Sequence, residues 1–227
     1  MTRRSESAWD RMGAIAGLWA VLLLATGYAI TWSTAANPAG ADADYVRALV
    51  AERMKWEWVT FVRLVGGTLL LWFMGALAGR LRTAEGDGGR VATAAFGLGV
   101  VWAAIWLLSG FFNSASILLA TTYADPGGSR VAGVLARETP YVLSGSVMFT
   151  LLLAASFATF RFDDFPKAYT RGTPALAVAL LVLALIDWYG AGALGPAIVG
   201  LALLWTGVTS ALLSSGGARR SISGERN

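Results

Sequence analysis

The chain has 227 residues, of which 56% are hydrophobic and 14% are charged, and its net charge is +4. Soluble domains usually carry about 25% charged residues, so this composition favours a protein that is embedded in lipid. Because the sequence contains neither Cys nor His, it excludes thiol chemistry, histidine-based catalysis and zinc, copper or haem sites built on these side chains, and we predict no metal site and no cofactor.

Six apolar segments are each long enough to cross a bilayer, which takes about 20 residues. They cover residues 13–32, 58–81, 91–112, 140–160, 174–190 and 194–214. We therefore predict an all-α fold, a single polytopic bundle of six transmembrane helices over residues 1–214, followed by a disordered cytoplasmic tail at 215–227. The first segment is longer than the apolar region of a signal peptide, so we interpret it as a retained helix. Pro140 and Pro174 are expected in the first turns of the fourth and fifth helices.

A charged stretch between the first two segments, residues 39–57, predicts a short amphipathic helix on the outer surface. Asp42 or Asp44 would cap this helix at its N-terminus. Tyr45, Leu49 and Trp56 follow at roughly helical spacing, so they should share its apolar face.

The third segment stays apolar to about Tyr123, which is longer than one span but too short for two spans and a turn. We predict one span over residues 91–112 and a continuation, residues 113–123, that projects outward or lies in the interface. Ser109, Asn113 and Ser116 have i, i+4, i+7 spacing, so they should lie on one face of this helix.

Basic residues are distributed unevenly between the two sides of this topology. Twelve of the 18 Lys and Arg residues fall on the side of the two termini and six on the other side. The positive-inside rule therefore places both termini in the cytoplasm and predicts a multi-pass protein of the cell membrane. Short basic runs between apolar segments indicate contact with lipid headgroups rather than with nucleic acid.

The ionisable residues within the spans indicate where a site would lie. Arg63 is early in the second helix and Asp187 is late in the fifth, at similar depth, and because each charge alone is costly in a bilayer we expect them to form an ion pair. The candidate ligand-binding residues are Arg63, Asp187, Asn113, Ser109 and Glu57. This cluster is interpreted as a structural ion pair, as an outward-opening pocket for a small polar or amphiphilic ligand, or as side chains that snorkel to the surface without contact.

Two glycine pairs, Gly13/Gly17 and Gly75/Gly79, have the G-x-x-x-G spacing that lets helix backbones approach closely. Each pair serves either packing within the bundle or association of copies into a homo-oligomer. The other partners that we predict are membrane lipids.

Two segments support a resemblance: Phe61-Val62-Arg63-Leu64 in the second helix, and Leu204-Trp205-Thr206-Gly207-Val208-Thr209-Ser210 at the end of the last. Through them the chain resembles, over nearly its whole length, a broad group of uncharacterised bacterial six-helix integral membrane proteins of unknown function. The resemblance implies the fold and the membrane location, and it implies no activity.

No catalytic residue is predicted, because an intramembrane enzyme would need Asp187 or Glu57 as a general base without any histidine. We favour a non-catalytic membrane protein, either a small-ligand or lipid binder or an accessory subunit of a membrane complex. The alternative is a small-molecule transporter with an outward-facing polar pocket between helices 2, 3 and 5. The sequence has no clear internal repeat, which is a frequent feature of transporters.

Overall fold

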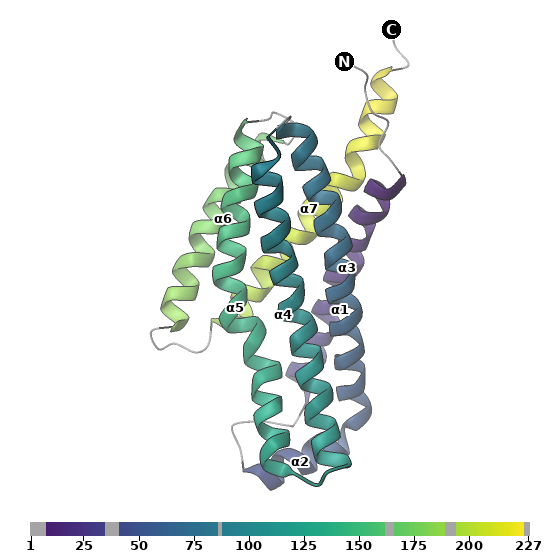
Figure 1. Cartoon of the computed structure of the whole chain (residues 1–227), viewed down its shortest axis with the longest axis vertical. Helices are drawn as coiled ribbons and strands as arrows, with labels where there is room; N and C mark the ends of the chain where they lie inside the picture. The colour runs from purple at the N-terminus through teal and green to yellow at the C-terminus, as the bar shows by residue number, and fades with distance from the viewer. Residues whose placement is uncertain (1–7, 35–40, 86–87, 162–165, 189–193, 225–227) are drawn as a thin grey trace.

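The computed structural model describes residues 8–34, 41–85, 88–161, 166–188 and 194–224, and over these residues the chain forms helices and no strand (Figure 1). The helices are α1 (Ala8–Ser33), α2 (Asp42–Ala51), α3 (Arg53–Glu85), α4 (Arg90–Thr121), α5 (Pro126–Arg161), α6 (Lys167–Ile186) and α7 (Gly195–Gly224). The predicted all-α fold is therefore confirmed.

Six of these helices contain stretches that are long and apolar enough to cross a membrane. The stretches are Arg11–Thr31, Arg53–Thr83, Arg90–Thr121, Pro126–Ala158, Lys167–Ile186 and Gly195–Ser215. The prediction of a membrane protein with six spans is thus confirmed, and α2 is the additional short helix between the first two spans.

The spanning helices form one bundle in which α3, α4 and α5 lie side by side (Figure 1). Helix α1 packs against α3, α6 packs against α5, and α7 crosses the bundle in contact with α1 and α5. Helix α1 begins and α7 ends at one end of the bundle, which we call the terminal end. Helix α2 lies across the opposite end, which we call the α2 end.

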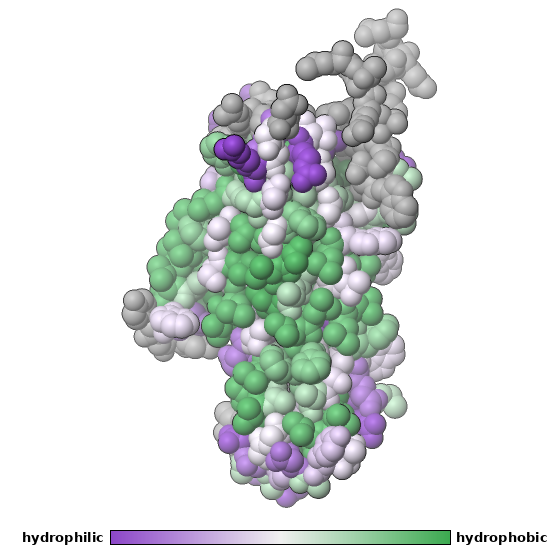
Figure 2. Space-filling view, viewed as in Figure 1, coloured by the Kyte–Doolittle hydropathy of each residue, from purple (hydrophilic) through white to green (hydrophobic). Residues whose placement is uncertain are grey.

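The spans fall into two length classes. Those of α1, α6 and α7 have 20–21 residues, about 30 Å at 1.5 Å per residue, whereas those of α3, α4 and α5 have 31–33 residues, about 46–50 Å. Because the hydrocarbon core of a bilayer is about 30 Å thick, the long helices extend beyond it. They do so at the α2 end, where α2 and residues 53–61, 113–121 and 126–137 form what we call the projecting part (Figure 1). Figure 2 shows hydrophilic residues at both ends and a hydrophobic band between them.

Helix α2 covers the projecting part with its apolar face. Tyr45 and Leu49 are buried in a small apolar cluster with residues of α3 and α4. The predicted amphipathic helix is therefore confirmed for Tyr45 and Leu49, but Trp56 belongs to α3 and reaches the same cluster from there. The N-cap of α2 is Ala41, without a side-chain hydrogen bond, rather than Asp42 or Asp44. Both aspartates lie within the first turn, where a negative charge still complements the helix dipole.

One face of α4 forms core along the whole helix. Trp102 and Trp106 are buried at the level of the membrane, and Ser109, Asn113 and Ser116 are buried toward the α2 end. The shared face predicted for the three polar residues is confirmed. The third segment is one continuous helix from residue 90 to residue 121, as predicted, and it makes no second crossing.

Helices α5 and α6 begin earlier than the sequence predicts. They start at Pro126 and Lys167, so Pro140 and Pro174 lie inside helices rather than in their first turns. A proline inside a helix frees the carbonyl four residues earlier, and in membrane proteins neighbouring side chains satisfy that carbonyl.

At the C-terminus, α7 continues to Gly224, whereas the sequence predicts a disordered tail from residue 215. Residues 225–227 lie outside the described part of the chain.

Candidate functional site

Arg63 lies in a buried polar junction where four helices meet. Its side chain is buried, with 4% of its surface exposed. Nη1 donates a hydrogen bond to the Ala136 carbonyl of α5 at 3.3 Å, and Nη2 donates to Thr31 Oγ1 of α1 at 3.2 Å. Ser109 Oγ of α4 donates to the same Ala136 carbonyl. The two polar residues predicted from α3 and α4 therefore do meet, on a backbone oxygen of a third helix.

Pro140 explains why this carbonyl is open. In a regular helix the N–H of residue 140 would bond to the carbonyl of residue 136, but proline has no N–H. The freed Ala136 oxygen has two lone pairs, and Ser109 and Arg63 occupy them. The junction is thus a structural consequence of a proline inside α5.

The predicted ion pair between Arg63 and Asp187 is wrong. The guanidinium of Arg63 donates to neutral oxygens, and among the described residues no ion pair joins it to Asp187. Asp187 instead accepts the Leu194 N–H through Oδ1 at 2.9 Å, and so links the end of α6 to the residue before α7. The two charges have similar depth, but α6 packs against α5 at the edge of the bundle, away from the interior position of Arg63.

The remaining predicted site residues lie elsewhere. Asn113 Nδ2 donates to the Trp56 carbonyl at 2.9 Å and to Thr60 Oγ1 at 2.8 Å, so it fastens α4 to α3 inside the projecting part. Glu57 is at the surface, where its carboxylate pairs with Arg53 at 2.6 Å. The five candidates therefore do not form one site: Arg63, Ser109 and Asn113 are interior, Glu57 is on the surface of α3, and Asp187 is in a separate cavity.

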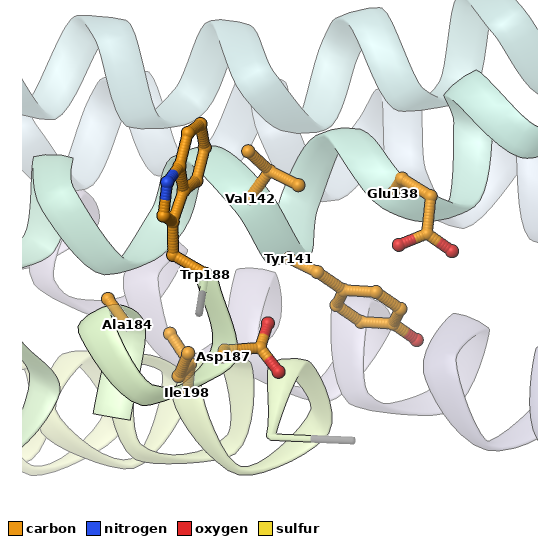
Figure 3. A pocket seen from close by; sticks show the side chains of 7 residues that line it. All are labelled: Glu138, Tyr141, Val142, Ala184, Asp187, Trp188 and Ile198. Carbon is orange, nitrogen blue, oxygen red and sulfur yellow. The ribbon is translucent and has the colours of Figure 1, made fainter. Parts of the chain in front are cut away.

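That cavity, which we call the α5–α7 cavity, has a volume of about 250 Å³ and lies between α5, the end of α6 and the start of α7. Figure 3 shows Glu138 and Tyr141 of α5 near Asp187 and Trp188, which follow the last residue of α6. The lining residues are Glu138, Tyr141, Val142, Ala184, Asp187, Trp188 and Ile198. The cavity therefore combines two carboxylates, two aromatic rings and an apolar wall.

Two glycines allow the three helices to meet around the cavity. A Cβ on Gly195 would lie 2.7 Å from Cγ of Tyr141, and a Cβ on Gly145 would lie 2.6 Å from Cβ of Ala184. Both distances are too short for real atoms, so only glycine fits at either position. The Tyr141 ring is also held from α1 by an edge-to-face contact with Tyr28, at 6.1 Å between ring centroids.

The lining of the cavity contains two carboxylates and no basic side chain. No basic side chain of the described residues lies within ion-pair distance of Asp187. Glu138 has Arg137 as a neighbour, with 3.5 Å between Nε and Oε1, but both side chains are nearly half exposed and solvent screens this pair. Among the described residues no group of three acidic side chains gathers as a metal site.

Three residues that line the cavity were not among those predicted from the sequence: Glu138, Tyr141 and Trp188. Glu138 and Tyr141 have i, i+3 spacing on α5, which places them on one face of the helix. That signal was present in the sequence, but it required α5 to begin well before Pro140. Trp188 adjoins Asp187 in the sequence and lines the same cavity.

No family model matches the chain, and no curated protein and no solved structure shows a significant match to it. The geometry of the cavity and the chemistry of the residues that line it are therefore the basis for a functional proposal.

Proposed function

We propose that this protein is a non-catalytic membrane protein that binds a lipid or a small amphiphilic ligand in the α5–α7 cavity. One observation carries the proposal: a cavity with an apolar wall of Val142, Ala184 and Ile198 is bordered by the carboxylates of Glu138 and Asp187. Such a combination suits a molecule with one apolar and one polar end. Apolar walls with a few convergent polar groups are typical of ligand sites.

The level of the cavity in the bundle supports a lipid-like ligand. Helix α6 has 20 residues, about 30 Å, from the terminal end to Ile186, and Asp187 follows directly. The hydrocarbon core is about 30 Å thick. When the first residue of α6, Lys167, is placed at one face of this core, the cavity therefore lies at the other face. This is the level at which lipid headgroups meet acyl chains.

The size of the cavity also agrees with this proposal. Pockets for drug-sized ligands have volumes of about 300–1,000 Å³, and the α5–α7 cavity is smaller, at about 250 Å³. It suits a headgroup and the first part of a chain, with the rest of the ligand outside. Val142 and Trp188 are 49% and 75% exposed at its rim, which leaves the site open to the surroundings.

A substitution that fills the cavity tests the proposal. Val142→Trp adds a large ring at the rim, and Val178→Trp is the matched control, because Val178 is 55% exposed on α6 and does not line the cavity. In native mass spectrometry from mild detergent, the wild type and Val178→Trp should retain bound lipid, and Val142→Trp should lose most of it. Equal retention by all three proteins would refute the proposal.

The transporter alternative has less support from the geometry. It requires several free polar groups between the second, third and fifth spans. Arg63, Ser109 and Asn113 instead direct hydrogen bonds to other residues of the bundle, and Nε of Arg63 is the one side-chain nitrogen of the three residues without a partner. We therefore prefer binding to transport.

For location, we propose the cell membrane with both termini in the cytoplasm. In the six-span topology the terminal end has twelve basic and seven acidic residues, and the α2 end has six basic and seven acidic residues. This asymmetry is what the positive-inside rule associates with a cytoplasmic terminal end.

For homo-oligomerisation, we propose the Gly75/Gly79 face of α3. Gly13 and Gly17 are used within the bundle, since a Cβ on either would meet Ala76 or Phe73 of α3. Gly75, by contrast, is exposed, and a Cβ added to it would have no other atom within 4 Å. Only the second glycine pair therefore offers a face to another helix.

A further inference from the structure

The charges of the α5–α7 cavity restrict its ligand further. The cavity is lined by two carboxylates, those of Glu138 and Asp187, and by no basic side chain. An anionic headgroup would be repelled there, while a cation would be attracted.

Asp187 has capacity for such a cation. Its Oδ1 accepts the Leu194 N–H, and its Oδ2 accepts no hydrogen bond from the described residues. A carboxylate can accept about four hydrogen bonds, so a donor that enters the cavity finds free lone pairs. An ammonium group has three donors and a positive charge, and it suits this oxygen.

The aromatic rings favour the same chemistry. Tyr141 and Trp188 border the cavity on either side of Asp187 (Figure 3). The face of an aromatic ring attracts a cation, most strongly for Trp. Carboxylates and rings together therefore select a positively charged nitrogen rather than a neutral hydroxyl.

We infer that the α5–α7 cavity recognises the ammonium group of an amphiphile. The nitrogen lies between Glu138 and Asp187, and the attached apolar chain runs along Val142, Ala184 and Ile198. This inference rests on the proposed ligand-binding function and names its chemical class. Two sources offer the same chemistry, an ethanolamine lipid and a free small amine.

A charge-neutral variant tests the inference without removing the hydrogen bond to Leu194. Asp187→Asn retains an oxygen that can accept the Leu194 N–H, but it removes the negative charge. Asp125→Asn is the matched control, because Asp125 Oδ1 accepts the Gly128 N–H at 3.0 Å in the first turn of α5, outside the cavity. Glu138→Gln, at a side chain that is 47% exposed, is a second test if Asp187→Asn fails to fold.

The probes are equal amounts of phosphatidylethanolamine and phosphatidylglycerol, added to purified, delipidated protein and measured by native mass spectrometry. Charged hydrogen bonds are strong enough that the wild type and Asp125→Asn should retain the ethanolamine lipid about tenfold better. In Asp187→Asn or Glu138→Gln this preference should fall to near equality. Displacement of the lipid by millimolar ethanolamine would support a free amine as ligand, and resistance to displacement would support the lipid.

Equal retention of both lipids by the wild type, or an unchanged preference in both charge variants, would overturn the inference. The Val142→Trp variant separates this failure from failure of the proposed function. If Val142→Trp loses both lipids while the wild type shows no headgroup preference, ligand binding stands and the ammonium inference fails. If Val142→Trp retains both lipids, the proposed function itself fails.

Discussion

The carbonyl of Ala136 receives hydrogen bonds from two other helices because Pro140 has no N–H to offer it. Arg63 thereby gains an acceptor inside the bundle without a carboxylate. Both acceptors of Arg63 are neutral oxygens, so they replace part of the hydration of the guanidinium but do not neutralise its charge. A proline that was expected to start a helix therefore fixes how four helices meet.

A double-mutant cycle tests this role of Pro140. Ser109→Ala should destabilise the protein by about 1 kcal/mol, because the Ala136 carbonyl loses one donor. In a Pro140→Ala background, residue 140 can donate to that carbonyl, so the same change should cost clearly less. Unfolding in sodium dodecyl sulfate, followed by circular dichroism for the four proteins, gives the coupling energy. Equal costs in both backgrounds would contradict the account.

At the scale of elements, the sequence predicted helices well and their neighbours poorly. Hydropathy and period located the six spans, the amphipathic α2 and the continuous α4. Hydropathy reports how deep a residue lies, but it does not report which helices are adjacent. Arg63 and Asp187 were therefore placed at a common depth and wrongly paired, while the contacts of Asn113 with α3 could not be foreseen.

The freed carbonyl, in contrast, needs only one fact beyond the sequence, the start of α5. Once α5 is known to begin at Pro126, an internal Pro140 implies an open acceptor at residue 136. Glu138 and Tyr141 also follow as a shared face only from that earlier start. Because the sequence predicts that α5 begins at Pro140 instead of Pro126, it predicts neither the polar junction around Arg63 nor the α5–α7 cavity.

The two G-x-x-x-G pairs allow a matched prediction on helix packing. Gly13→Ala should lower stability by about 1–3 kcal/mol, because its new Cβ would lie 2.5 Å from Cβ of Ala76. Gly75→Ala should be neutral or raise stability by up to about 1 kcal/mol. The added methyl group would have no other atom within 4 Å, and alanine favours the helical backbone more than glycine does. Thermal unfolding in detergent measures both effects, and the reverse order would show that the packing of α1 on α3 is wrongly described.

The same position tests association of copies. Gly75→Leu should lower the dimer fraction in analytical ultracentrifugation if α3 forms the contact, since a bulky side chain prevents close approach of the two backbones. A dimer fraction that does not change would exclude this face.

At the scale of the whole molecule, the proposed orientation of the bundle can be tested by labelling from one side of the membrane. The native sequence has no Cys, so single cysteines can be labelled without background. Gly88 is exposed and Gly127 is partly exposed, at opposite ends, and the nearest atoms to an added Cβ are 3.8 Å and 3.7 Å away. With an impermeant maleimide in intact cells, Gly127→Cys should react, whereas Gly88→Cys should react only after permeabilisation. The opposite pattern would place the termini outside the cell.

The unequal spans have a consequence for the surrounding lipid. Along α3, α4 and α5, exposed apolar side chains such as Met54, Leu118 and Val131 continue into the projecting part, while the α6 side is only about one hydrocarbon thickness tall. Acyl chains beside the long helices must stretch, or the whole protein must tilt to bring its tall side into the bilayer, at a cost of a fraction of a kcal/mol per Å of mismatch. The protein should therefore deform a thin bilayer unevenly around its perimeter. Lipids with longer acyl chains should gather beside α3, where the apolar surface is tallest.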